Sequence, residues 1–284
     1  MKVKRAVILA AGLGTRFFPI AKSVDKEMLP IIDKPCIQYL VEEAVQSGIK
    51  EIIFIINSPD SLIKKYFTGS KRLHQVLLKK NKKDISLQIK KIEKIAKFIF
   101  VIQKKPLGDG HAILCAKQYI KHEPFAALFG DDLYHYKIPP LKQLLQKFNK
   151  TGSPVIALKK IDKKDSNKYG MAKLGQNNMV QQLVEKPAPK KAPSDLAITG
   201  KYIITPELFN DLQNSKPEKK DKELRLIDGL KTFLKHSEIY GMEIKGQRFD
   251  TGDKLEYIKA VINFGLKSRQ FGKEIKKYIA ALDF

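Results

Sequence analysis

Val7-Ile8-Leu9-Ala10-Ala11-Gly12-Leu13-Gly14-Thr15-Arg16 is a short apolar run that leads directly into a glycine-rich turn. The β-branched and aliphatic residues at its start predict a strand that is covered on both faces. Gly12 and Gly14 allow the backbone to turn sharply and let its N–H groups approach an anion. Three cationic side chains follow, at Arg16, Lys22 and Lys26. A strand, a glycine turn and nearby cations together predict a binding site for phosphate groups.

Two common phosphate-binding motifs are missing from this stretch. The Walker spacing does not occur, and Phe17 stands where the third glycine of the dinucleotide-binding pattern belongs. The sequence therefore disfavours a P-loop NTPase and an NAD-dependent enzyme. Other classes of polyphosphate-binding protein remain as alternatives.

The composition describes a basic globular protein. The chain has 284 residues, of which 43% are apolar, so it can bury a sizeable core. Its 54 Lys and Arg residues against 30 Asp and Glu give a formal net charge of +24. This charge favours an anionic partner, although lysine-rich solvated faces produce the same composition. The lysine clusters at 79–83 and 216–222 lack the interleaved aromatic residues of a strand-binding groove, so we expect no nucleic-acid partner.

The sequence also contains features that indicate the cellular compartment of the protein. The only cysteines, Cys36 and Cys115, lie in apolar helical-looking segments, which favours buried thiols in a reducing environment. No apolar run approaches the roughly 18 residues of a transmembrane helix, so membrane insertion is not expected. The basic start resembles a signal peptide, but its apolar run is short and cleavage would remove the glycine turn. We therefore expect a cytoplasmic protein.

Apolar strands alternate with helical patterns along the whole chain, which is typical of an α/β fold built from βαβ units. The expected strands are 7–9, 51–56, 98–102, 124–129, 155–158, 168–172, 180–184, 196–204 and 240–244. The expected helices are 37–45, 63–67, 70–97, 112–120, 206–214, 224–234, 255–264 and 275–281. Residues 188–193 and 215–222 are expected to be loops. Without a repeat or a clear boundary, the chain is predicted to form a single domain, 1–284.

Polar or glycine-rich segments follow three of these strands at the point where each ends. They are Gly12, residues 103–111 and Gly130-Asp131-Asp132. Ligands of open α/β sheets lie beyond the carboxyl ends of the strands, so the three segments are expected to meet at one site. Because successive residues of a strand point to opposite sides, only one of Asp131 and Asp132 should face that site.

Several motifs resemble those of one enzyme family. The run L-A-A-G-L-G-T-R-F-F-P at 9–19, followed by K-E-M-L-P at 26–30, is similar to the signature of the sugar-1-phosphate nucleotidylyltransferases. L-G-D-G-H-A-I-L-C-A at 107–116 resembles their uridylyltransferase branch. The resemblance implies a Rossmann-like nucleotidyltransferase fold with a mixed, mostly parallel central sheet flanked by helices. It also implies a nucleotide-binding half, a sugar-binding half and C-terminal helices, at 1–135, 136–254 and 255–284.

The resemblance further implies which residues form the site. Asp131 in G-D-D and Asp250 in F-D-T-G would hold Mg²⁺, which usually takes one or two carboxylates together with phosphate oxygens. The implied catalytic residues are Arg16 and Lys26, which would neutralise the triphosphate and the leaving pyrophosphate, and Lys186 of E-K-P, which would hold the sugar phosphate. The implied substrate-binding residues are Ala10, Ala11, Gly12, Gly14, Glu27, Gln103, Gly108, Asp132, Gly170 and Glu185.

The implied reaction is in-line attack of glucose-1-phosphate on the α-phosphorus of UTP, which yields UDP-glucose and pyrophosphate. Three alternatives remain open: a relative that uses dTTP or another sugar-1-phosphate, a catalytically weak regulator that binds sugar nucleotide, and, more distantly, a nucleic-acid-binding protein. The resemblance suggests a homodimer or homotetramer. Asp25, Arg225 and Ile227 depart from the family pattern, which usually has Pro, Gln and Thr at these positions.

Overall fold

Strand β1 (Arg5–Ala10) forms along the apolar run near the start of the chain and lies inside the central sheet. It pairs in parallel with β4 (Glu51–Ile56) on one side and with β6 (Phe125–Phe129) on the other. β5 (Lys97–Ile102) continues the parallel arrangement beyond β4. The computed structural model describes residues 2–217 and 221–282. The first four strands predicted from the sequence are therefore confirmed.

The second half of the sheet joins the first in antiparallel fashion. β11 (Leu196–Ile204) pairs with β6, β9 (Gly170–Leu174) pairs with β11, and β10 (Val180–Glu185) pairs with β9. β8 (Val155–Lys160) also pairs with β11 and carries the parallel strand β12 (Tyr240–Glu243). Within the described residues the sheet has nine strands, and its main path runs β10-β9-β11-β6-β1-β4-β5. The predicted mixed sheet is confirmed, with its parallel pairs mainly in the first half.

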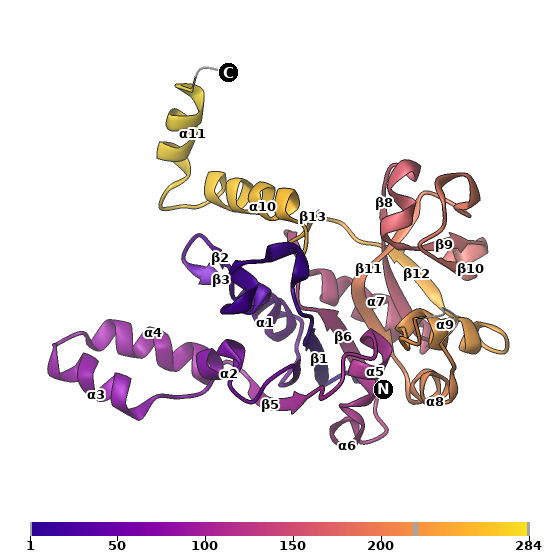
Figure 1. Ribbon diagram of the computed structural model, residues 1–284, viewed down its shortest axis with the longest axis horizontal. Coiled ribbons are helices and arrows are strands. Elements are labelled where there is room, and N and C mark those ends of the chain that lie inside the picture. The colour runs from indigo at the N-terminus through magenta and orange to yellow at the C-terminus, as the bar shows by residue number, and fades with distance from the viewer. Residues whose placement is uncertain (1, 218–220, 283–284) are drawn as a thin grey trace.

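Helices flank both faces of the sheet (Figure 1). On β1, Ala6 and Ile8 belong to one hydrophobic core, whereas Val7 and Leu9 belong to the opposite one, as the period-two alternation of a strand requires. The first core packs against α1 (Cys36–Gln46), α2 (Leu62–Phe67) and α7 (Pro140–Thr151). The second packs against α5 (Asp109–Leu114), α6 (Lys117–Ile120), α8 (Pro206–Asn214) and α9 (Leu226–Leu234).

Several predicted helices have different bounds in the structure, including α11 (Gly272–Ala280), which begins three residues earlier than the predicted 275–281. The lysine-rich segment 70–97 forms a helical hairpin of α3 (Lys71–Lys79) and α4 (Lys83–Glu93), which projects from the body (Figure 1), and its last residue begins β5. The helix predicted at 112–120 divides into α5 and α6. α9 begins two residues later than predicted because the backbone of Leu224 is paired with Leu107 and Gly110 at the start of α5. The helix α7 was not predicted. Of the loop predicted at 215–222, residues 218–220 lie outside the described residues.

An antiparallel ribbon of β7 (Asp132–His135) and β13 (Gln247–Asp250) brings the end of the chain back to the G-D-D segment. α10 (Lys254–Leu266) packs on this ribbon, and α11 (Gly272–Ala280) extends beyond it (Figure 1). The remaining short strands are β2 (Pro30–Ile31) and β3 (Lys34–Pro35). Short 3₁₀ helices occupy Thr15–Phe17, Ile20–Lys22, Lys26–Met28, Lys163–Lys168, Gln176–Asn178 and Pro189–Lys191. Among the described residues, no helix has both the length and the apolar character needed to cross a membrane.

Candidate active site

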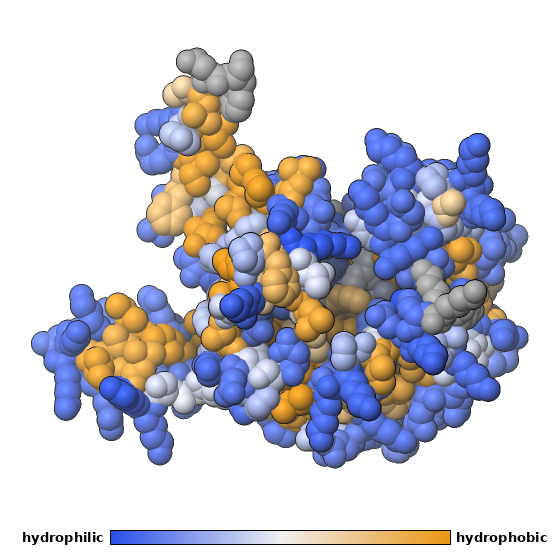
Figure 2. Space-filling view, viewed as in Figure 1, coloured by the Kyte–Doolittle hydropathy of each residue, from blue (hydrophilic) through white to orange (hydrophobic). Residues whose placement is uncertain are grey.

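A cleft of about 400 Å³ opens beyond the carboxyl ends of β1 and β6, between the two halves of the sheet. The surface is visibly hollowed there (Figure 2). A neighbouring hollow of about 320 Å³ shares Lys26 and Asp131 with it and reaches Gly12 and Gln103. The three strand-end segments therefore meet as predicted. The cleft is lined by Arg16, Lys26, Asp131, Glu185, Lys186 and Asp250, among others.

Asp131 and Asp250 approach each other across Gly252. The pairing of β7 with β13 places Asp132 opposite Asp250, next to the end of β6. Thr251 secures the turn by donating from its backbone N and from Oγ1 to the carbonyl oxygen of Asp131, at 2.8 and 2.9 Å. A Cβ on Gly252 would lie 2.6 Å from Asp131 Oδ2 and 3.1 Å from Asp250 Oδ1. Glycine therefore keeps the space between the two carboxylates open.

The ammonium group of Lys26 lies against this pair and bonds to Asp131 Oδ2. Burial alone would raise the pKa of Asp131, but the charge and hydrogen bond of Lys26 outweigh burial and hold that pKa below its ordinary value. Burial, together with the charge of Asp131, raises the pKa of Asp250. A divalent cation between the two carboxylates would offset the burial and the repulsion from Asp131 that raise the pKa of Asp250.

The donor set fits Mg²⁺. Within residues 2–217 and 221–282, no group of three or more His, Cys, Asp or Glu side chains is arranged to hold a metal. Mg²⁺ commonly takes only one or two carboxylates and completes its shell with water and phosphate oxygens. Asp131 and Asp250, with the open space above Gly252, are the residues that could hold it.

Asp132 points away from Asp131, and only 2% of its surface is exposed. Arg248 Nε donates to its Oδ1, and Gly200 N donates to its Oδ2 at 3.1 Å. Because the protein engages both oxygens, this placement favours a supporting role over the direct substrate contact that we predicted. Arg248 also lies 3.9 Å from Asp250 Oδ2. Sequence reasoning missed Arg248, although its two-residue spacing from Asp250 places both on one face of a strand.

A buried lysine supports the G-D-D segment from behind. Lys201 is 0% exposed, and its Nζ donates to the carbonyl oxygen of Asp132 at 3.0 Å and lies 3.1 Å from Glu43 Oε2. Glu43, on α1, also accepts a hydrogen bond from Leu141 N at 2.9 Å. Both charges are therefore paired and hydrogen bonded, which is the condition under which a core tolerates them. Neither residue was identified from the sequence.

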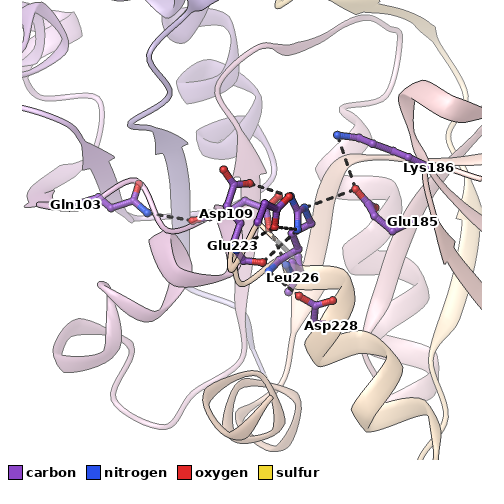
Figure 3. Close-up of polar contacts among 10 residues, drawn as sticks. Gln103, Asp109, Glu185, Lys186, Glu223, Leu226 and Asp228 are labelled. Carbon is purple, nitrogen blue, oxygen red and sulfur yellow. Dashed lines mark hydrogen bonds and ion pairs between the residues drawn. The ribbon is translucent and has the colours of Figure 1, made fainter. Parts of the chain in front are cut away.

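Gln103 follows β5 and is largely buried. Its Nε2 donates to the carbonyl oxygen of Gly108 at 3.0 Å (Figure 3) and lies 3.0 Å from His111 Nδ1. The protein thus uses the donor side of the amide and leaves Oε1 as the acceptor for a ligand. His111 lies in the polar segment 103–111 and contacts this amide.

The family resemblance implied that Gly108 binds the substrate. This glycine has a left-handed φ of 103°, and a Cβ there would lie 2.2 Å from the carbonyl oxygen of Leu224. The close contact that requires glycine at this position is therefore with the protein's own backbone. Gly108 and Gln103 both line the hollow.

Glu27 lies in the wall of the same hollow with 2% of its surface exposed. Its Oε2 has no hydrogen-bond partner among the described residues, and its Oε1 is 3.7 Å from Lys26 Nζ. Burial raises its pKa to about 7, against the opposing effect of the Lys26 charge. A buried carboxyl group with a raised pKa that faces a cleft is a common feature of functional sites.

The glycine turn lies at the rim of the cleft. Gly14 has a left-handed φ of 62°, and a Cβ on Gly12 would meet the Lys26 side chain at 3.7 Å. Residues 10 and 11 end β1 and begin the turn, and both are buried. Arg16 is exposed at the mouth of the cleft, where it can reach an anionic ligand.

The sugar-side residues predicted from the sequence lie on β9, on β10 and directly after β10. A Cβ on Gly170 would lie 3.2 Å from Glu185 Oε2, so glycine lets this carboxylate lie against β9. Lys186 has a left-handed φ of 47°, and its Nζ lies 3.8 Å from Glu185 Oε1 (Figure 3). A left-handed residue other than glycine costs about 1–3 kcal/mol, and such strain clusters at functional sites.

The departures from the family pattern have identifiable contacts. Asp25 accepts hydrogen bonds from Ser61 Oγ at 2.8 Å and Leu62 N at 3.0 Å, which ties the Lys26 loop to α2. Ile227 is 6% exposed in the second core, with its Cδ1 3.2 Å from the Cβ position of Gly170. Arg225 lines the cleft.

Residues 5–264 match the nucleotidyl transferase family. A UTP–glucose-1-phosphate uridylyltransferase of Staphylococcus epidermidis is 41% identical over 286 residues, covering 99% of both chains. The structure of a UTP-bound UGPase from Acinetobacter baumannii superposes with a TM-score of 0.91 at 34% identity, covering 99% of this chain and all of the other. A UDP-glucose pyrophosphorylase in complex with UDP-glucose gives a TM-score of 0.85 at 35% identity, covering 94% of this chain and all of the other.

Proposed function

The chain belongs to the nucleotidyl transferase family, and we propose that it transfers the uridylyl group of UTP to glucose-1-phosphate, giving UDP-glucose and pyrophosphate. The observation that carries this proposal is the order of groups along one cleft. Gln103 lies on one side, the Asp131 and Asp250 pair lies in the middle, and Lys186 lies on the other side. That order matches a base, a phosphate chain and a sugar phosphate.

In the proposed reaction an oxygen of the sugar phosphate attacks the α-phosphorus of UTP, and the bond to pyrophosphate breaks. The attacking group is already anionic, so the enzyme chiefly supplies positioning and charge neutralisation. Arg16 and Lys26 neutralise the triphosphate and the leaving pyrophosphate, while Lys186 holds the attacking phosphate. Mg²⁺, which Asp131 and Asp250 would hold, supplies additional positive charge at the phosphates when bound.

The two ends of the substrate pair have matching acceptors. Gln103 Oε1 can accept a hydrogen bond from the imide N–H of uracil, because the amide nitrogen is engaged with Gly108. Glu185, next to Lys186, can accept hydrogen bonds from sugar hydroxyl groups. These contacts support the reading of a base on one side and a sugar on the other.

Pyrophosphate release, measured for each nucleoside triphosphate against a panel of sugar-1-phosphates, tests the proposal. We expect turnover with UTP and glucose-1-phosphate that depends on Mg²⁺ and falls strongly in Lys186→Met. Lys190→Met, in the nearby exposed loop, serves as the matched control. Activity with dTTP but not UTP would replace the proposal with a thymidylyltransferase, and UDP-glucose binding without turnover would replace it with a regulator.

We further propose that the protein is a cytoplasmic homodimer or homotetramer. Large exposed apolar side chains gather on the hairpin of α3 and α4 and on α10 and α11 (Figure 2), and such patches mark interaction surfaces. They include Leu73, Val76, Ile85, Leu87, Leu255, Ile258, Ile262 and Tyr278. Light scattering after size exclusion tests the assembly, and a monomer at micromolar concentration would refute it.

The free thiols of Cys36 and Cys115 agree with a reducing compartment, which cell fractionation tests.

A further inference from the structure

Residues 221–226, here called the strap, lie across the start of α5. Leu224 N donates to the carbonyl oxygen of Leu107 at 2.8 Å, and Gly110 N donates to the carbonyl oxygen of Leu224 at 3.0 Å. At the end of the strap, Leu226 N donates to Asp109 Oδ1 at 2.7 Å (Figure 3). The strap is therefore held by the same loop that presents Gln103 to the nucleotide.

Two glycines of that loop, Gly108 and Gly110, allow the strap to pack closely against it. A Cβ on Gly108 would lie 2.2 Å from the carbonyl oxygen of Leu224, and a Cβ on Gly110 would lie 2.7 Å from the carbonyl carbon of Arg225. Both distances are far below an ordinary van der Waals contact. The strap can therefore lie this close to residues 108 and 110 only because both are glycine. The loop that carries Gly108 and Gly110 therefore lies directly against the backbone of Leu224 and Arg225.

The Arg225 side chain extends from the strap toward the sugar side of the cleft. Only 13% of this side chain is exposed. Its guanidinium bonds to Asp221 and Glu223, which fixes its plane. Its Nε lies 3.9 Å from Glu185 Oε1, the same oxygen that lies 3.8 Å from Lys186 Nζ. Glu185 therefore lies between two cations, one on the strap and one that follows it in sequence.

We propose that Arg225 is a positioning residue for the sugar side of the site, acting through Glu185. The Arg225 charge attracts the Glu185 carboxylate and keeps it directed toward the sugar hydroxyls, so that Lys186 is free to bind the sugar phosphate. Without Arg225, Lys186 is the nearest cation to Glu185 and is drawn away from the phosphate. This inference rests on the proposed function and assigns a role to a position at which the chain departs from its family.

Steady-state kinetics of Arg225→Ala with UTP and glucose-1-phosphate test the inference. We expect the KM for glucose-1-phosphate to rise about tenfold or more, the loss typical of one charged contact, while the KM for UTP stays within about twofold. Arg225→Lys retains the charge and should recover part of the loss. UTP affinity, measured by calorimetry, should be unchanged in Arg225→Ala, which shows that the nucleotide half is folded.

A double-mutant cycle with Glu185→Gln separates this role from a structural one. If Arg225 acts through Glu185, adding Arg225→Ala to Glu185→Gln produces little further change in the KM for glucose-1-phosphate. Fully additive effects, or an equal rise of both KM values in Arg225→Ala, would overturn the inference. Wild-type protein without turnover would overturn the proposed function instead, so the two failures are distinguishable.

Discussion

The Oδ2 atom of Asp131 lies 2.6 Å from the position that a Cβ would occupy on Gly252. A side chain at residue 252 would therefore enter the space between Asp131 and Asp250. This relationship joins a strand end in the first half of the chain to a turn near its end, and it defines the centre of the cleft.

Replacing either carboxylate at this centre should abolish metal-dependent turnover. Asp131→Asn and Asp250→Asn remove a ligand of the proposed Mg²⁺ without changing side-chain shape, and Gly252→Ala obstructs the space. We expect pyrophosphate release to fall by about 10²-fold or more in each variant, with the far-ultraviolet circular dichroism unchanged. Mn²⁺ binding in the presence of UTP, followed by electron paramagnetic resonance, should weaken in parallel. Full activity in both Asn variants would contradict the metal assignment.

Gly108→Ala should weaken UTP binding, because the new Cβ collides with the carbonyl oxygen of Leu224 and displaces the loop that carries Gln103. We expect the Kd for UTP to rise about tenfold or more. Gly48→Ala is a matched control: its φ of 97° is close to the 103° of Gly108, but no atom of the described residues lies within 4 Å of its Cβ position. The control should cost about 1 kcal/mol of unfolding free energy and leave UTP affinity intact. A Kd for Gly108→Ala equal to that of Gly48→Ala would show that the collision with Leu224 does not weaken UTP binding.

Glu27→Gln should change how stability depends on pH in metal-free buffer. The wild-type pKa is raised to about 7 by burial, against an unfolded value near 4.5, so the folded state binds the proton more tightly than the unfolded state. The stabilising contribution of the protonated group is complete below about pH 4.5 and is lost as the pH rises toward 7. Relative to the wild type, Glu27→Gln should gain up to about 3 kcal/mol across this interval and gain no more above it. Urea unfolding in EDTA at several pH values measures the difference, and a constant difference between pH 4 and 8 would contradict the assignment.

Lys201→Met should destabilise the protein by about 3–5 kcal/mol, because it leaves the Glu43 carboxylate buried without its partner. The double variant Lys201→Met with Glu43→Gln removes both charges and should recover much of that loss. Lys97→Met, which breaks a pair with Glu51 at a largely exposed lysine, should cost far less. Chemical denaturation gives all three values. A double variant no more stable than Lys201→Met alone would show that the charge pair is not the cause.

Much of the first half of the sheet could be predicted from the sequence. Buried parallel strands are nearly continuous apolar runs, so β1, β4, β5 and β6 are visible without any tertiary information. The glycine and carboxylate residues that follow them could be assigned to one site because parallel strands end at one edge of a sheet. The start of α9 could not be predicted, because it depends on the contact of the strap with the start of α5 rather than on helical periodicity.

The sequence by itself determined that this protein has an α/β fold with glycine turns and carboxylates at its strand ends, because local apolar patterns and turn residues carry that information. Only the tertiary structure decided what each group contacts. Asp132 accepts a hydrogen bond from Arg248, Gly108 packs against the carbonyl oxygen of Leu224, and Lys201 forms an ion pair with Glu43. These pairs are 116, 116 and 158 residues apart in the sequence, so no local pattern relates them. Their contacts follow from sheet pairing and from packing between distant segments, which exist only once the chain has folded.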